Sequence, residues 1–203
     1  MSNYIFAPSP SCGVSEHPFV TYRDAFSNEE IIELVRYLDS LPKETGTVGD
    51  GETGSVNNNV RRSTVSWLHL NNDTQWIYDR LAYVIRVLNG QFYKFDLYGF
   101  NEPMQYTVYD SSVQGHYDWH LDSIISPNNF AAPRKFSIIL QLSDPVEYVG
   151  GDLQIMTSSN PESIDKQKGM VAAFPSYRLH RVTPVTQGIR KTLVAWICGP
   201  SFK

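Results

Sequence analysis

Histidine and aspartate alternate along one short stretch of the chain, as His116, Asp118, His120 and Asp122. In a β-strand, residues two apart project from the same face, so either His-x-Asp pair would present an imidazole beside a carboxylate. Such a pair, joined by a second imidazole from elsewhere in the chain, forms a facial triad that leaves three coordination positions of an Fe(II) ion open. The spacing therefore predicts a metal site, but it does not choose between the two pairs.

A third candidate ligand, His180, lies near the C-terminus and precedes a predicted hairpin turn at Gln187-Gly188. With a tight turn there, Arg190 on the returning strand pairs near Val185, five residues from His180. The two backbones are then roughly 17 Å apart at the usual strand rise. A five-carbon diacid that chelates the metal, met by an extended arginine, would span this gap. Arginine suits the role because its planar fork binds a carboxylate with two hydrogen bonds, and Thr192 on the same face would add a hydroxyl.

Two amphipathic helices are predicted in the first half of the chain. Ser27 is a good N-cap for the first, with Glu30 as its capping-box partner, and Pro42 ends that helix. We expect Asp73 to cap the second helix, which Asn89-Gly90 ends. Between the helices, a polar segment rich in glycine and asparagine runs from 43 to 59, and we expect it to be a lid that is mobile without substrate.

From about Gln91 onward the apolar residues follow a strand-like period, in six to eight short segments separated by turn signals. Helices followed by strands indicate an α+β protein whose main body is a β-sandwich or jelly roll. We find no repeat and no second domain boundary. We therefore expect one domain over residues 1–203, with a helical part at about 24–90 and a sheet core at about 91–200.

Composition excludes several classes of protein. A net charge of −4 over 203 residues gives no electrostatic case for nucleic acid or an anionic membrane as an obligatory partner. Only Cys12 and Cys198 are present, so no disulfide framework is expected and a reducing compartment is the default. We see neither a secretory signal nor an apolar run of the roughly 20 residues that a membrane span needs. The sequence predicts a cytoplasmic protein.

Several motifs, in order, resemble those of the Fe(II)- and 2-oxoglutarate-dependent dioxygenases. The nearest branch is the prolyl 4-hydroxylase-like group, in particular the bacterial PKHD-type hydroxylases. The resemblance covers roughly half the chain, from Phe95 to Trp196. It rests on Tyr117-x-x-His120-x-Asp122, Leu142-Ser143-Asp144-Pro145, Gly150-Gly151-Asp152-Leu153, Phe174-Pro175-Ser176, and Leu179-His180-Arg181-Val182-Thr183-Pro184-Val185-Thr186-x-Gly188-x-Arg190.

The resemblance implies a fold and a set of site residues. The fold is a double-stranded β-helix, or jelly roll, with the N-terminal helices packed against the major sheet. Carried over by position, the iron ligands are His120, Asp122 and His180. Arg190 corresponds to the residue that binds the distal carboxylate of 2-oxoglutarate, and Tyr109 to a tyrosine that also touches the co-substrate. The Tyr-x-x-His-x-Asp motif thus selects His120 and Asp122 over the other pair.

Residues around this set have simpler interpretations beside functional ones. His116 and Asp118 are candidates for substrate contact, or for shaping the rim of the site. Arg62 is a third candidate, although it and Arg61 read more simply as an exposed pair of charges. Tyr117 and Trp119 are expected to pack on the opposite face of the metal strand.

The implied activity is hydroxylation of a substrate C–H bond with O2 and 2-oxoglutarate, releasing succinate and CO2, with ascorbate as a possible reductant. A carboxylate at Asp122 argues for hydroxylation, because halogenases of this superfamily leave that position empty for halide. The leading substrate is a peptide or protein side chain, with proline as the example. The alternatives are a hydroxylase or demethylase of a nucleic acid or small molecule, which the acidic balance disfavours for nucleic acid, and a metal-binding jelly roll without turnover. The oligomeric state is not predicted.

Overall fold

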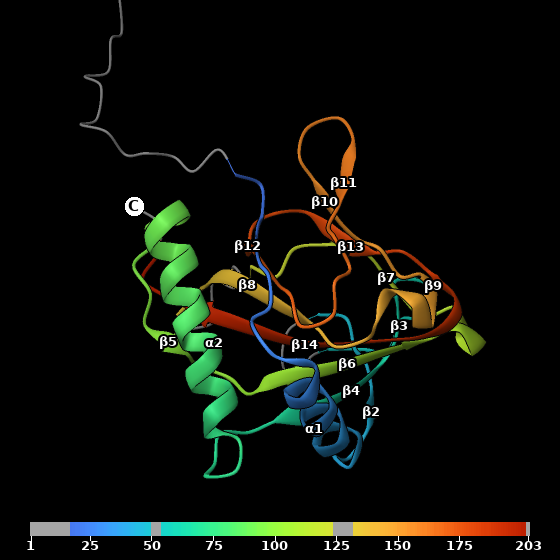
Figure 1. Cartoon of the computed structure of the whole chain (residues 1–203). Helices are drawn as coiled ribbons and strands as arrows, with labels where there is room; N and C mark the ends of the chain where they lie inside the picture. The colour runs from blue at the N-terminus through green and yellow to red at the C-terminus, as the bar shows by residue number, and fades with distance from the viewer. Residues whose placement is uncertain (1–16, 50–53, 124–131, 202–203) are drawn as a thin grey trace, which may run out of the picture.

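The computed structural model describes residues 17–49, 54–123 and 132–201, which form two antiparallel sheets with helices on one side (Figure 1). Within these ranges the major sheet has nine strands, with β5 and β9 both pairing with β14 beside its main path. That path runs in the order β1 (Val20–Tyr22), β12 (Val171–Pro175), β8 (Arg134–Gln141), β14 (Val185–Cys198), β6 (Met104–Asp110), β4 (Thr64–Leu68) and β2 (Glu44–Thr45). The side strands are β5 (Gly99–Phe100) and β9 (Tyr148–Gly150).

The minor sheet of the described chain has five strands and contains the stretch with alternating histidine and aspartate. Its order is β11 (Pro161–Ser163), β10 (Leu153–Met156), β13 (His180–Val182), β7 (His116–His120) and β3 (Arg61–Arg62). Two short 3-10 turns join strands: η3 (Ser111–Val113) connects β6 of the major sheet with β7 of the minor sheet, and η4 (Pro145–Glu147) connects β8 with β9 within the major sheet.

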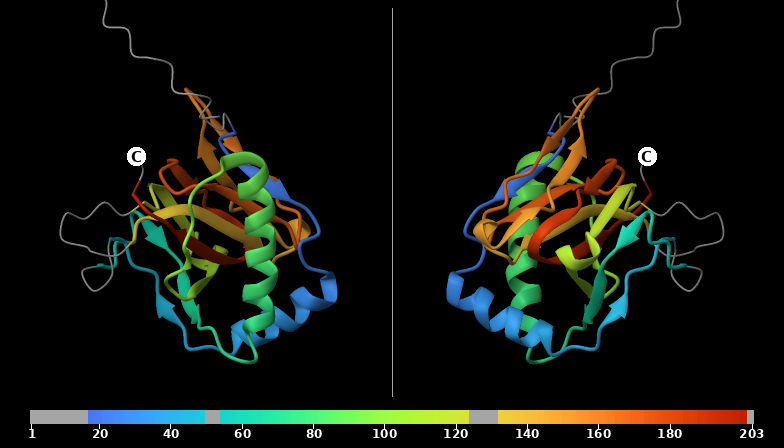
Figure 2. Two further views of the ribbon diagram at one scale, coloured as in Figure 1. Left: turned by 90° about the vertical axis from the view of Figure 1, so that its left-hand side faces the viewer. Right: turned by 90° about the vertical axis from the view of Figure 1, so that its right-hand side faces the viewer.

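Alternation along β8 shows how the two sides of the major sheet are filled. Ile138 and Leu140 belong to the core cluster that contains the helices, whereas Ile139 belongs to the cluster between the sheets. This follows from the two-residue period of a strand. Figure 2 shows helix α2 (Gln75–Leu88) lying along the helical side, where it covers the major sheet. The predicted α+β architecture, with helices against the major sheet, is confirmed.

Helix α1 (Asn28–Asp39) begins with the predicted capping box. The Glu30 amide donates to the Ser27 hydroxyl at 3.2 Å, and the Ser27 amide donates to the Glu30 carboxylate at 2.8 Å. The same carboxylate binds Arg80 of α2 at 2.8 Å. One glutamate therefore starts the first helix and ties it to the second.

The start of α2 differs from the prediction, whereas its end at Leu88, with Asn89 as the C-cap, agrees with it. Thr74, and not Asp73, is the N-cap, and the Asn71 side chain accepts from the amides of both residues. Beyond Leu88 the chain continues as the π-helix η2 (Asn89–Tyr93), so the strand period does not begin at Gln91. The Asn89 side chain accounts for this continuation, because it bonds both the amide and the carbonyl of Phe95 and closes the turn.

The predicted hairpin at Gln187-Gly188 is wrong. Strand β14 passes through both residues, and the break lies earlier, at Thr183-Pro184 between β13 and β14. Gly188 has φ 70°, and a Cβ there would lie 1.9 Å from the Glu147 carbonyl oxygen. Gly188 pairs with Tyr148 of β9, and the next residue, Ile189, begins the pairing with β6. The glycine thus lets one strand bend between two partners.

The segment from 43 to 59 is partly described. Glu44 and Thr45 pair with β4, and Val48 forms a bridge with Ser55. The central part of the predicted lid, residues 50–53, lies outside the described residues, and the mobility of the segment stays a prediction. Both helices of the described chain are too short and too polar to cross a bilayer.

We expect Gly188→Ala to destabilise the protein by about 2–4 kcal/mol, because alanine is disfavoured at positive φ and its Cβ would collide with a carbonyl. Chemical denaturation measures this free energy of unfolding. Gly90→Ala is the matched control, since a Cβ at Gly90 meets no atom of the described structure within 4 Å. Equal stability of the two variants would contradict the steric argument.

Candidate metal centre

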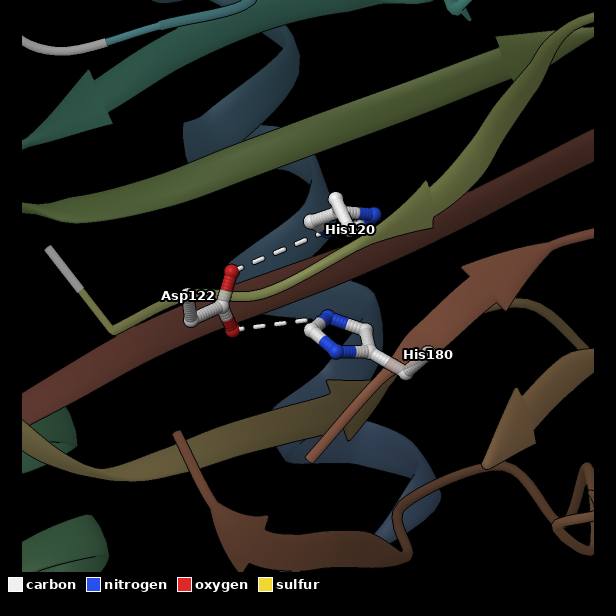
Figure 3. A group of neighbouring side chains, drawn as sticks. All are labelled: His120, Asp122 and His180. Atoms are coloured by element: carbon white, nitrogen blue, oxygen red, sulfur yellow. Dashed lines mark ion pairs between the residues drawn. The ribbon is translucent and has the colours of Figure 1, made fainter. Parts of the chain in front are cut away.

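Pairing of β7 with β13 places His120 directly opposite His180. Asp122 lies just beyond the end of β7, and the amides of Asp122 and Ser123 both donate to the Ser176 carbonyl, at 3.0 and 2.9 Å. Figure 3 shows the Asp122 carboxylate lying between the two imidazole rings. Its Oδ1 is 3.7 Å from His120 Nε2, and its Oδ2 is 3.5 Å from His180 Nε2. The ligand atoms of the three residues all lie within 4.8 Å of one another, so the group could hold a metal ion.

Backbone carbonyls set the tautomer of both histidines. His120 Nδ1 lies 2.7 Å from the Asp118 carbonyl, and His180 Nδ1 lies 2.9 Å from the Arg178 carbonyl. Because a carbonyl oxygen only accepts, each Nδ1 carries the proton and donates it. The lone pair of each Nε2 is therefore directed toward Asp122, which is the arrangement that metal-binding histidines use.

The charge states also suit a metal. Burial, together with the neighbouring His180, lowers the pKa of His120 to about 3, so its ring is neutral at physiological pH. Burial alone would raise the pKa of Asp122, but His180, His120 and the Ser137 hydroxyl outweigh burial and lower it to about 2. A neutral imidazole and an ionised carboxylate are the forms that bind metal, so no deprotonation is needed at neutral pH.

Ser137 orients the carboxylate. This fully buried residue lies in β8, and its hydroxyl donates to Asp122 Oδ2 at 2.7 Å and contacts the Ser176 hydroxyl at 3.0 Å. The sequence motifs did not predict a role for Ser137. One signal was available, because a hydroxyl in the middle of an apolar strand needs a buried partner.

The expected strict alternation along the metal strand is wrong. Tyr117 pairs with Val182 and His120 pairs with His180, so two residues of β7 lie between these pairs where β13 has one. This β-bulge turns Tyr117 to the same side as His120. The two rings stack, with their centroids 3.5 Å apart and their planes 11° apart. Tyr117 therefore packs on the candidate ligand, and not on the opposite face.

None of the three candidate substrate contacts lines the cavity beside the candidate ligands. A cavity of about 340 Å³ contains the three candidate ligands, and neither His116, Asp118 nor Arg62 is among the described residues that line it. His116 bonds the Gln114 carbonyl at 2.9 Å, and Asp118 accepts from the amide of Trp119 at 2.8 Å. The bulge explains this placement, because it separates both side chains from that of His120.

Arg61, and not Arg62, faces the cavity. Arg61 is buried and donates to Ser63 at 2.8 Å, to Gln105 at 2.7 Å and to the Thr47 carbonyl at 3.1 Å. The expectation of an exposed charge pair is therefore wrong for Arg61. Alternation along β3 divides the pair, since successive side chains of a strand point to opposite faces.

The same arginine completes a stack of side chains on the candidate ligands. Its guanidinium lies 4.6 Å from the centroid of the Tyr117 ring, which in turn stacks on His120. The centroid of His120 is 4.1 Å from that of His180, and His180 is 4.7 Å from Phe174. Both imidazoles are thus held between neighbours on either side.

Arg190, Thr192 and Tyr109 line the same cavity as the three candidate ligands. Arg190 is 3% exposed, pairs with Tyr109 across β14 and β6, and lies 5.4 Å from the centroid of the tyrosine ring. Its Nε has no hydrogen-bond partner within the described part of the chain. A buried donor without a partner is costly, so this cavity suits a ligand that brings an acceptor. Burial raises the pKa of Tyr109, which keeps its hydroxyl protonated.

Residues 104–198 match the model of the 2OG-Fe(II) oxygenase superfamily. A PKHD-type hydroxylase of Teredinibacter turnerae is 37% identical over 97 residues, which are 47% of this chain and 42% of that protein. A PKHD-type hydroxylase of Hyphomonas neptunium is 42% identical over 82 residues, which are 40% of this chain and 37% of that protein. The chain thus spans about two fifths of the length of these curated relatives.

Solved structures share the fold at low sequence identity. A prolyl hydroxylase from Trichoplax adhaerens, bound to a peptide of hypoxia inducible factor, has a TM-score of 0.70 and 16% identity, over 90% of this chain and 84% of that one. The viral collagen prolyl hydroxylase of Paramecium Bursaria Chlorella virus-1 has a TM-score of 0.67 and 20% identity, over 92% and 99% of the chains. A prolyl-4-hydroxylase of Pseudomonas putida has a TM-score of 0.66 and 16% identity, over 91% and 94%.

We expect Ser137→Ala to bind Mn(II), used as a stand-in for Fe(II), about 10–100-fold more weakly, because the Asp122 carboxylate loses the donor that orients it. Calorimetric titration measures the affinity. Ser66→Ala is the matched control, since Ser66 is also buried in the sheet and its hydroxyl has no partner among the described residues. If both variants bind Mn(II) like the parent protein, Ser137 does not support the site.

Proposed function

We propose that the protein is an Fe(II)- and 2-oxoglutarate-dependent dioxygenase that hydroxylates a C–H bond of its substrate. The match of residues 104–198 to the model of the 2OG-Fe(II) oxygenase superfamily supports this proposal. One observation carries the proposal. The His120, Asp122 and His180 group shares its cavity with a buried arginine whose Nε is unpaired.

The Nε2 atoms of His120 and His180 and the carboxylate of Asp122 would hold Fe(II). Two imidazoles and one carboxylate are the donor set of non-haem Fe(II) oxygenases, and they leave three positions for ligands. When bound, Fe(II) supplies the redox chemistry that couples O2 to the decarboxylation of 2-oxoglutarate. The chain's share is to keep both rings in one tautomer, through the Asp118 and Arg178 carbonyls.

Arg190 would bind the distal carboxylate of 2-oxoglutarate, with Thr192 and Tyr109 beside it. The guanidinium stays charged when buried, and a carboxylate would satisfy its free Nε. Tyr109 offers a protonated hydroxyl. The charge pattern fits a diacid whose far end meets Arg190 while its near end reaches the metal site.

The reaction balances with one atom of O2 in the hydroxylated substrate and the other in succinate. The substrate C–H becomes C–OH, and 2-oxoglutarate loses CO2 and gains the other oxygen to become succinate. Asp122 would fill the coordination position that a halogenating enzyme leaves to halide, which favours hydroxylation. Asp122 and His180 are buried, which limits the access of bulk water to the candidate ligands.

The substrate we propose is a prolyl residue of a peptide or protein, with ascorbate as a reductant and the cytoplasm as the location. The names of the PKHD-type relatives and of the prolyl hydroxylases with this fold support that substrate class. A net charge of −4 weighs against nucleic acid.

The substrate assignment predicts that proline-containing peptides stimulate the conversion of 2-oxoglutarate to succinate, in the presence of Fe(II) and ascorbate, above the uncoupled background. Free amino acids and nucleotides serve as the comparison classes, and mass spectrometry shows a gain of one oxygen atom. Stimulation by nucleotides alone would replace the prolyl substrate with a nucleic-acid one. Metal binding without succinate from any class would indicate a jelly roll that binds metal without turnover.

The ligand assignment predicts that His120→Ala loses at least about 100-fold in succinate formation, because the metal loses one of three protein ligands. His116→Ala is the matched control and keeps activity, since the same residue type on the same strand bonds the Gln114 carbonyl outside the cavity. A His120→Ala protein with full succinate production, or equal losses in both variants, would refute the assignment.

A further inference from the structure

The stem of Arg190 crosses a glycine. Gly151 has φ 61°, and a Cβ there would lie 2.9 Å from Arg190 Cδ and 3.2 Å from Tyr148 Cε2. Arg190 and Tyr148 therefore meet above a residue that has no side chain. Only glycine leaves this space and adopts this backbone conformation without strain.

Tyr148 is a buried tyrosine whose oxygen accepts from Gln141. The Gln141 Nε2 lies 2.8 Å from the Tyr148 hydroxyl and 3.4 Å from the Ser143 carbonyl. A carbonyl only accepts, so the NH2 end of the amide faces both oxygens. The hydrogen bond from Gln141 thus fixes the orientation of the Tyr148 hydroxyl.

The Arg190 guanidinium also affects the pKa of the Tyr148 hydroxyl. Burial raises the pKa of Tyr148, and the Arg190 guanidinium opposes this rise as a positive charge and as a hydrogen-bond donor. Lys166 also contacts the tyrosine ring, with its Nζ 5.0 Å from the ring centroid. Lys166 is in turn held at 2.6 Å by Asp152 and at 2.6 Å by the Gly150 carbonyl.

Strand register explains how Tyr148 comes to be there. It belongs to β9 and pairs with Gly188, two residues before Arg190 on β14. The positive φ of Gly188 lets β14 accept β9 at this point and then join β6. The bend in β14 therefore brings Tyr148 beside Arg190.

We propose that Tyr148, oriented by Gln141, is a positioning residue that fixes the Arg190 guanidinium for recognition of the distal carboxylate of the co-substrate. This inference rests on the proposed function. Tyr148 lies beside Arg190 at Gly151 and offers it an acceptor, while the Arg190 Nε has no partner among the described residues and stays available to the ligand. Pre-ordering the arginine lowers the entropy lost on binding, and this benefit applies only to ligands that carry the distal carboxylate.

The test compares two five-carbon oxo acids, 2-oxoglutarate and 2-oxopentanoate, which differ in the distal carboxylate. Each is titrated calorimetrically into the Mn(II)-loaded full chain. Tyr148→Phe removes the hydroxyl, and Gln141→Leu removes the group that orients it. Tyr78→Phe is the matched control, since Tyr78 is a buried tyrosine whose hydroxyl donates to the Leu68 carbonyl at 2.7 Å, away from the cavity.

We expect Tyr148→Phe and Gln141→Leu each to weaken 2-oxoglutarate binding about tenfold and to leave 2-oxopentanoate binding and Mn(II) affinity unchanged. In turnover, the KM for 2-oxoglutarate rises by a similar factor while kcat stays nearly constant. Tyr78→Phe changes neither. Thermal unfolding of each variant identifies any loss of fold.

A Tyr148→Phe protein that binds 2-oxoglutarate like Tyr78→Phe would overturn the inference and leave the proposed function standing. Equal weakening for both acids would also overturn it, because the effect would then be a general disturbance of the cavity. If Tyr148→Phe unfolds, the same comparison with Gln141→Leu decides the question. Parent protein that does not prefer 2-oxoglutarate to 2-oxopentanoate would instead refute the proposed function, and the inference with it.

Discussion

The pairing of β7 with β13 is the interaction on which the site depends. It places His120 opposite His180, and the bulge beside this pair sets the direction of both neighbours along β7. Tyr117 turns inward to stack on His120, whereas His116 and Asp118 lie outside the cavity lining. A regular strand would have kept His116, Asp118 and His120 on one face. The extra residue of the bulge thus leaves His120 and Asp122 in the cavity lining and keeps the other His-x-Asp pair, His116 and Asp118, out of it.

A second constraint acts from the major sheet, because the proposed function needs both a metal site and a cation that recognises a carboxylate. The three candidate ligands come from the minor sheet and the turn after it, while Arg190 and Thr192 come from β14. Ser137 links the two sheets, since it lies on β8 and donates to Asp122. Packing between the sheets therefore fixes the distance between the two ends of the cavity, and Ile139 and Val182 lie in that packed layer.

The sequence predicted what depends on local chemistry. The capping box of Ser27 and Glu30 is a contact over three residues, and it is present as expected. Apolar periods predicted two helices followed by short strands, and the packing of the helices against the major sheet was implied by the family resemblance. The choice of His120 over His116 was not available from periodicity, and it came from motif spacing shared with a known family.

Features that depend on pairing between distant strands were not predictable in this way. The bulge in β7 is defined only relative to β13, some 60 residues later in the chain. Gly188 read as a turn because glycine favours turns, whereas its positive φ here lets one strand change partners. Arg61, Ser137 and Tyr148 are buried polar residues whose partners lie on other strands, so their roles depend on tertiary contacts.

Arg190 shows why such contacts bear on function as well as on fold. A buried guanidinium with an unpaired Nε destabilises the free protein, because the group has lost water without gaining a full set of acceptors. Because Gly151 has no side chain, the aliphatic part of Arg190 fits above it. Tyr148, Gln141 and Lys166 pack around this part of the cavity. This arrangement is unfavourable as a device for stability alone. A carboxylate bound in the cavity would supply the missing acceptor. The arrangement that is unfavourable in the free protein would therefore stabilise the complex with the ligand.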